Sequence, residues 1–134
     1  MNEVKMRSNC PLSFALDLLG DKWTLLIIRD MILDGKRFYK DFLGSKEGMA
    51  TNILSDRLKK LENNGIITSK VYEQLKTRKE YALTDKGKDL IPVLVDMMVW
   101  SAKYQSDLAI TQQFINKVKS DRDDVIQNIL SGLD

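Results

Sequence analysis

Three polar side chains recur on one face of a segment with the pattern of an amphipathic helix. Asn52, Ser55 and Lys59 follow one another at spacings of three and four residues, so they are neighbours on a helix surface. An asparagine amide can pair with adenine, and a lysine ammonium can bind guanine or a phosphate. The spacing therefore predicts contacts with base edges or phosphates of a nucleic acid. The alternative is an ordinary solvated helix face.

Further charged side chains of the same segment have two readings each. Arg57 flanks the apolar side of the helix, where it can contact a phosphate or form an internal salt bridge. Asp56 would repel phosphate unless it pairs with Lys60 or accepts a hydrogen bond from a cytosine amine. Thr51 stands where the helix begins and can cap its first turn. The candidate DNA contacts of this helix are Thr51, Asn52, Ser55, Arg57, Lys59 and Lys60.

Positive charge is concentrated in the middle of the chain. The whole protein carries a net charge of only +2, yet residues 36–79 hold eleven Lys and Arg against five Asp and Glu. A local surplus of this kind is typical of a phosphate-binding face. Its last members, Lys76, Arg78 and Lys79, are candidate contacts with the DNA backbone. A lysine-rich solvated surface would show the same counts.

Cys10 is the only cysteine, so an internal disulfide is excluded. Pro11 suits the first position of a helix, which puts Cys10 at or next to the helix N-cap. The N–H groups there favour an anion and hence a reactive thiolate. Cys10 is thus a candidate redox sensor, and the alternative is a small packing residue.

No residue pattern indicates catalysis or a bound metal. The chain has no histidine, which excludes Ser-His-Asp and Cys-His catalysis and every histidine-based metal site. No phosphate loop and no paired acidic motif stands out. We therefore expect no enzyme activity, no metal and no cofactor.

Apolar periodicity places the polar helix within a larger set of elements. Leu54, Leu58 and Leu61 form its apolar face, and Asn64-Gly65 ends it. Two strand-like runs follow at about 66–72 and 81–83, joined by a polar tip at 73–79. A helix fits a DNA major groove, and a hairpin directly after it can reach the neighbouring backbone. This order predicts a helix-turn-helix followed by a wing.

The other elements are predicted to be helices. The segment 22–33 is apolar on most sides, including Trp23, and should be the buried centre. Pro92 should kink a helix running from about 84 to 104, or start a new one. In the tail, Ser120 and Asp123 resemble a capping pair between two helical patterns. Further helices are expected at 11–19 and 39–43.

Length and hydropathy indicate one domain, 1–134, with a core of about 8–104 and a helical extension of about 105–134. The fold class is mainly α with a small β-hairpin. No apolar run reaches the roughly 18 residues of a membrane span, and the N-terminus lacks the apolar core of a signal peptide. We expect a cytoplasmic protein without a membrane partner.

Several motifs occur in a specific order over about residues 8–104. They are Cys10-Pro11, Ala15-Leu16-Asp17, Gly20-Asp21-Lys22-Trp23-Thr24-Leu25-Leu26-Ile27, Arg29-Asp30, Gly35, Arg37-Phe38, Leu54-Ser55-Asp56-Arg57-Leu58-Lys59-Lys60-Leu61-Glu62, Gly65, Glu80-Tyr81-Ala82-Leu83-Thr84-Asp85-Lys86-Gly87, Leu90, Pro92-Val93-Leu94 and Trp100. Their order and spacing resemble the HxlR family of bacterial winged-helix transcription regulators.

The resemblance implies a homodimeric repressor or activator that binds double-stranded DNA at a pseudo-palindromic operator. It places the recognition helix at about 50–63 and the wing at about 66–83, and we expect the terminal helices to form the dimer. Several family members sense oxidants or electrophiles through the cysteine that matches Cys10, and others do not. An oxidant or a small molecule is therefore the expected kind of signal.

Two segments depart from the family pattern. Residues 74–79 stand where the family often has a proline-containing turn, and Ala50-Thr51-Asn52 stands where a Ser-Pro pair is common. Wing shape and first-turn contacts are therefore open. A winged-helix module that binds an acidic protein partner is the alternative function.

Overall fold

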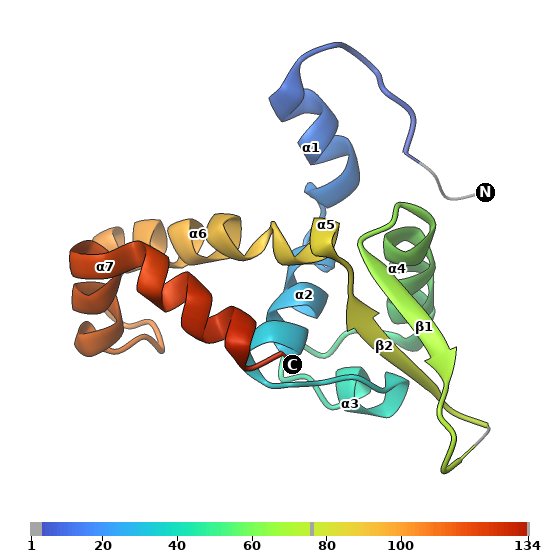
Figure 1. Cartoon of the computed structure of the whole chain (residues 1–134). Coiled ribbons are helices and arrows are strands. Elements are labelled where there is room, and N and C mark those ends of the chain that lie inside the picture. Colours follow the sequence, from blue (N-terminus) through green and yellow to red (C-terminus); the bar gives the residue numbers. More distant parts are fainter. Residues whose placement is uncertain (1–3, 76, 134) are drawn as a thin grey trace. The chain divides into compact units, whose positions relative to one another are not determined.

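The structure is a computed structural model that describes residues 4–75 and 77–133. It is mostly helical, with one antiparallel two-stranded sheet (Figure 1). The chain divides into two compact units at Gly87 and Lys88, and each unit is described by itself. The elements in chain order are α1 (Pro11–Leu19), α2 (Thr24–Leu33), α3 (Tyr39–Leu43), α4 (Thr51–Asn63), β1 (Ile67–Val71), β2 (Lys79–Leu83), α5 (Asp85–Lys88), α6 (Ile91–Tyr104) and α7 (Gln112–Ser131).

The first two helices begin near the predicted positions. Pro11 opens α1 with Cys10 at its N-cap. The α2 helix starts at Thr24 rather than at residue 22, because the carboxylate of Asp21 accepts hydrogen bonds from the backbone N–H groups of Trp23 and Thr24, both at 2.7 Å. Asp21 therefore satisfies two N–H groups at the start of α2.

The α2 helix supplies much of the core of the first unit, although less of its surface is buried than predicted. Ile27 and Ile28 are fully buried, whereas Trp23 is half-buried, with the ammonium of Lys22 4.6 Å from its ring centroid. Leu33 at the end of the helix is exposed. The other buried apolar residues of this unit are Leu18, Met31, Ile32, Phe42, Met49, Leu54, Leu58, Leu61, Ile66 and Ile67.

The helices α3 and α4 form a helix-turn-helix, and the hairpin after them is the wing. Ile67 pairs with Leu83 at the base of the hairpin and Val71 with Lys79 towards its tip. Gly65 takes a φ of 74° directly after α4, a backbone conformation that glycine adopts without strain. In Figure 1 the hairpin lies beside α4, which contacts β1.

The predicted helix from about 84 to 104 is divided in two. Thr84 caps α5, because its hydroxyl accepts a hydrogen bond from the N–H of Gly87 at 3.1 Å. Pro92 then occupies the first turn of α6, where its missing N–H leaves no helical hydrogen bond unmade. The proline starts a new segment, which was one of the two predicted outcomes.

The second unit consists mainly of α6 and α7, which pack against each other. The guanidinium of Arg122 on α7 makes two hydrogen bonds to the carboxylate of Asp96 on α6, at 2.9 and 2.8 Å. Two helical segments make up α7, as the two helical patterns of the tail predict, because Asp121 between them has non-helical dihedral angles. The predicted cap was wrong by one residue, because Asp121 and not Ser120 accepts from the N–H of Asp124.

Candidate nucleic-acid interface

The α4 helix buries one face and exposes the other, as its apolar spacing predicts. Leu54, Leu58 and Leu61 are buried. Asn52 and Lys59 are exposed and form no hydrogen bond or ion pair with any residue in the described part of the chain. Their polar groups are therefore available to a ligand. An exposed face of this kind can enter a DNA major groove.

The start of α4 is held by a side chain that the sequence did not single out. Tyr39, the first residue of α3, donates its hydroxyl hydrogen bond to the carbonyl of Thr51 at 3.2 Å and lies 3.1 Å from the hydroxyl of Ser55. Ser55 is exposed, but its hydroxyl is hydrogen-bonded to Tyr39. Thr51 is the first helical residue and does not cap the helix, because Ala50 occupies the N-cap.

Arg57 and Lys60 point back into the first unit. The Arg57 Nε donates to the Asp21 carboxylate at 2.9 Å, and Asp56 pairs with the same guanidinium. Lys60 Nζ donates to the backbone carbonyl of Asp17 at 3.3 Å. Asp56 therefore pairs with Arg57 and not with Lys60. Of the two roles considered for Arg57, a phosphate contact or an internal salt bridge, the structure shows the salt bridge.

The electrostatics of Asp21 follow from these contacts. Burial raises the pKa of Asp21, but hydrogen bonds from Thr24 and Trp23 and the charge of Arg57 outweigh burial and lower the pKa below its ordinary value. One carboxylate thus both caps α2 and anchors α4 through Arg57.

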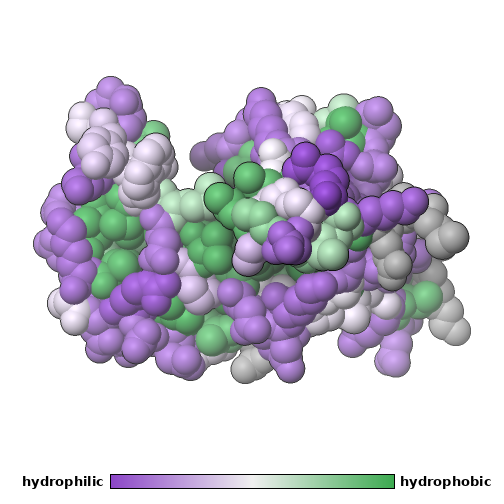
Figure 2. Space-filling view, turned by 90° about the horizontal axis from the view of Figure 1, so that it is seen from above, coloured by the Kyte–Doolittle hydropathy of each residue, from purple (hydrophilic) through white to green (hydrophobic). Residues whose placement is uncertain are grey.

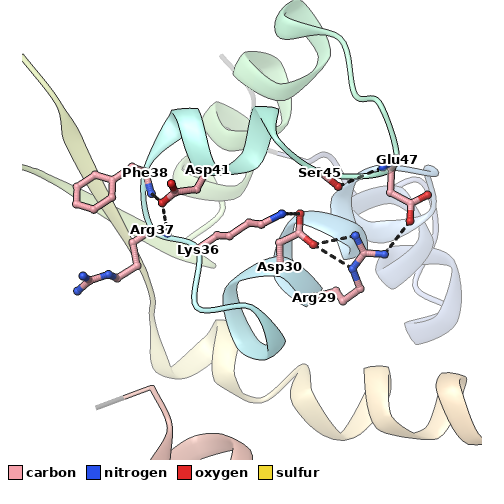
Figure 3. A network of polar contacts seen from close by, with 8 residues as sticks. All are labelled: Arg29, Asp30, Lys36, Arg37, Phe38, Asp41, Ser45 and Glu47. Atoms are coloured by element: carbon pink, nitrogen blue, oxygen red, sulfur yellow. Dashed lines mark hydrogen bonds and ion pairs between the residues drawn. The ribbon is translucent and has the colours of Figure 1, made fainter. Parts of the chain in front are cut away.

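A buried acidic residue organises the loops on either side of α3 (Figure 3). Asp30 is 1% exposed and binds the guanidinium of Arg29 at 2.8 Å and the ammonium of Lys36 at 3.3 Å. Arg29 also reaches Glu47, at 2.9 Å, in the turn before α4. Burial lowers the pKa of Arg29, but Asp30 and Glu47 raise it above its ordinary value. The network ties α2 to the turn of the helix-turn-helix.

Aromatic contacts hold the end of the wing that lies towards its tip. The Phe38 and Tyr72 rings meet edge to face with centroids 4.9 Å apart. The guanidinium of Arg78 lies 4.1 Å from the Phe38 centroid, within the range of a cation–π contact. Lys79 is exposed. Lys76, the third predicted wing contact, lies outside the described residues.

Cys10 is exposed at the N-cap of α1. Its N–H donates to the hydroxyl of Ser8 at 3.2 Å. The guanidinium of Arg7, three residues before Cys10, is paired with the carboxylate of Asp17. Cys10 therefore has the predicted position at the helix N-cap.

Residues 4–75 and 77–133 contain no group of three or more His, Cys, Asp or Glu residues placed to hold a metal ion. No helix in these ranges is long and apolar enough to cross a membrane.

The fold and the exposed α4 face define a winged helix-turn-helix transcription regulator, and comparison with known proteins agrees. Residues 18–109 match the model of the HxlR-like helix-turn-helix family, a match that spans the division between the two units. The chain belongs to this family.

Two bacterial relatives are named HTH-type transcriptional regulators. The protein sll1512 of Synechocystis is 39% identical over 88 residues, which cover 66% of this chain and 64% of that protein. YdeP of Bacillus subtilis is 34% identical over 72% of this chain and 74% of its own length. The chain thus spans a little under two thirds of the first relative and about three quarters of the second. Neither name describes an enzyme.

Solved structures show the same fold. The putative transcription factor PA1607 superposes with a TM-score of 0.69 at 36% identity, covering 78% of this chain and 73% of that one. The redox regulator HypR in its oxidised form superposes with a TM-score of 0.63 at 33% identity, and the match covers 72% of this chain and 98% of HypR. The reduced form of the transcriptional regulator YodB of B. subtilis superposes with a TM-score of 0.58 at 34% identity, and the match covers 72% of this chain and 95% of YodB.

Proposed function

We propose that this regulator binds a specific double-stranded DNA sequence with the exposed face of α4 and contacts the backbone with the wing. The observation that carries the proposal is the exposed, unengaged pair Asn52 and Lys59 on a helix whose opposite face is buried. Both side chain types recognise base edges in the major groove. The protein would work in the cytoplasm, together with the DNA that it binds.

The proposed assembly is a homodimer on a pseudo-palindromic operator. Apolar side chains are exposed on a helix of each unit, with Leu12 and Leu16 of α1 at 66% and 55% and Trp100 and Met97 of α6 at 67% and 51%. On the face drawn in Figure 2, hydrophobic side chains reach the surface between hydrophilic ones. Exposed apolar side chains gathered on a helix mark interaction sites. A second copy of the chain would cover those of each unit.

Cys10 is the proposed sensor of an oxidant or electrophile. It is exposed at a helix N-terminus, where backbone N–H groups favour a thiolate. The structural neighbours HypR and YodB support this proposal, since HypR is named a redox regulator and YodB has been determined in a diamide-treated form. Because the chain has no second cysteine, a lasting disulfide would join two subunits or a subunit and a small thiol.

The experiment that tests the function is sequencing of genomic fragments captured by the purified protein. A motif with dyad symmetry is expected, together with affinity that falls steeply with salt. Enrichment of no motif, or binding that is independent of base sequence, would contradict the proposal and favour a module that binds an acidic protein partner through the same basic surface.

A further inference from the structure

An open groove lies between the start of α3 and the wing. It has a volume of about 530 Å³, and its lining includes Tyr39, Lys40, Thr77, Arg78, Lys79 and Tyr81. Three of these side chains are cationic. We refer to this feature, defined by these six residues, as the α3–wing groove.

The positive charge of the groove is not neutralised by any of the residues that the structure describes. Lys40, Arg78 and Lys79 form no ion pair with any residue in the described ranges. Other cations of the first unit do: Arg37 and Lys70 share the carboxylate of Glu80 at 2.7 and 3.8 Å. Glu80 is therefore already occupied. Unpaired cations that line one groove favour an anionic ligand.

The two walls of the groove are fixed relative to each other. The N–H of Tyr81 on β2 donates to the carbonyl of Arg37 at 2.7 Å, and Phe38 forms an isolated antiparallel bridge with Glu80. Arg78 is stacked on Phe38 at 4.1 Å, which restrains the guanidinium while leaving the N–H donors at its edge free to bind. The groove is therefore preorganised for an anion with several acceptor oxygens.

Tyr39 connects this groove to the reading helix. Its ring lines the groove, and its hydroxyl contacts the Thr51 carbonyl and the Ser55 hydroxyl in the first turns of α4. An anion held here is thus one side chain away from the exposed face of α4. A phosphate of the same duplex would meet this geometry.

We propose that the α3–wing groove binds one backbone phosphate of the duplex that α4 reads, held by Lys40, Arg78 and Lys79. Tyr39 is a positioning residue that relates this phosphate to the start of α4. The inference rests on the proposed DNA binding and adds to it α3 residues that the sequence did not indicate. Phosphate contacts set the register of a protein on DNA, while base contacts specify the sequence.

The test compares Lys40→Ala, Lys79→Ala and the double variant with wild type. Binding is measured by fluorescence anisotropy over a range of KCl concentrations, on a captured duplex and on an unrelated duplex of equal length. Lys119→Ala is the control, since Lys119 is an exposed lysine of α7 outside the groove. Each groove variant should weaken binding to both duplexes and reduce the salt slope by up to about 0.9, the value for one phosphate.

If Lys40 and Lys79 bind the same phosphate, the double variant has a predicted limit on its loss of salt slope. The double variant should lose no more slope than about one contact, because both lysines bind the same group. Tyr39→Phe should instead lower the ratio of affinities for the two duplexes and leave the slope unchanged, because it removes only the hydroxyl that holds α4.

The outcomes separate the two proposals. Wild type that shows no salt-dependent DNA binding overturns both. Wild type that discriminates between the duplexes, with Lys40→Ala unchanged in slope, overturns only the groove site. A slope loss in the double variant well above about 0.9 would mean two separate phosphates and overturn the shared one. Saturable amide shifts of groove residues with sodium phosphate, together with unaltered DNA binding by Lys40→Ala, would assign the groove to a small anion instead.

Discussion

The polar side chains of α4 differ in how firmly the protein holds them. This difference separates side chains that can read DNA bases from side chains that stabilise the fold. Asn52 and Lys59 have no partner among the described residues, Ser55 is engaged by Tyr39, and Arg57 is bound to Asp21. A side chain that is already engaged must give up a contact before it can bind DNA. The free ones are therefore the best candidates for reading bases.

Replacing Asn52 with alanine should cost about 1–3 kcal/mol of binding free energy at one base pair and relax the preference there, because the amide is the group that pairs with adenine. Competition between operator duplexes changed at single positions would measure this. Asn63→Ala at the other end of α4 is the matched control, since helix-turn-helix proteins contact bases mainly with the N-terminal residues of the helix. An unchanged preference in a folded Asn52→Ala protein would contradict the assignment.

Arg57→Ala should reduce the free energy of unfolding by about 1–2 kcal/mol, because the charged hydrogen bond to the half-buried Asp21 is lost. Sequence preference should stay the same. Urea unfolding gives the first quantity and the duplex competition the second. The exposed Lys59→Ala change is the control, with stability expected within about 0.5 kcal/mol of wild type. A reversed pattern, stable but unselective, would make Arg57 a DNA contact.

Oxidation of Cys10 by diamide should change DNA affinity on the order of fivefold or more, the lower range of allosteric coupling. Diamide takes two electrons and two protons from two thiols, so the disulfide joins the Cys10 residues of two subunits. Non-reducing electrophoresis detects that species, and anisotropy measures the affinity. Cys10→Ser should bind DNA and not respond. Equal responses of the two proteins would mean that Cys10 is not the sensor.

At the scale of elements, local patterns predicted most helices well, whereas the predicted caps Thr51 and Ser120 were wrong and contacts were predicted poorly. The leucine spacing of α4, the capping by Asp21 and Thr84 and the break at Pro92 depend on residues close in sequence. Tyr39 and its contacts to α4 join residues twelve and sixteen positions apart, and only the packing of α3 on α4 brings them together. No local periodicity encodes such a pair.

Asp21 makes both a local and a long-range contact, since it accepts a hydrogen bond from Thr24 at the start of α2 and another from Arg57 of α4. Its pKa is lower in the folded protein than its usual value, so the unfolded chain binds more protons. This contribution to stability is complete above the unfolded pKa of about 3.9 and is lost as pH falls through the lower folded pKa. Asp21→Asn retains a good N-cap but lacks the titrating charge.

Urea midpoints measured from neutral pH down to below about 4 should therefore show wild type more stable than Asp21→Asn at neutral pH, with the gap closing in acid. Asp34→Asn, a change of an exposed aspartate at the end of α2, serves as the control. A gap that is constant with pH would mean that the charge of Asp21 contributes nothing.

At the scale of the whole molecule, each unit presents apolar side chains that its own core does not use. The organisation as a single domain stays a prediction, because the structure describes two units while the family match spans both. The sequence predicted a helix over the segment of α6 but could not separate the apolar residues that face the core from those that remain exposed. Leu94 is buried, whereas Met97 and Trp100 are exposed.

These exposed residues predict a dimer in the absence of DNA. A single helix-turn-helix reads few base pairs, and two copies in fixed relation bind half-sites about one helical turn apart. Trp100→Glu places a charge where Trp100 is now 67% exposed, so the folded unit should tolerate it while a dimer interface should not. Sedimentation at micromolar concentration should show dimers for wild type and monomers for the variant, whose operator affinity should fall because the two half-sites are no longer linked. Gln105→Glu adds the same charge at the end of α6 and removes no apolar surface, so it should remain dimeric. A wild-type monomer, or a Trp100→Glu dimer of unchanged affinity, would mean that α6 does not form the interface.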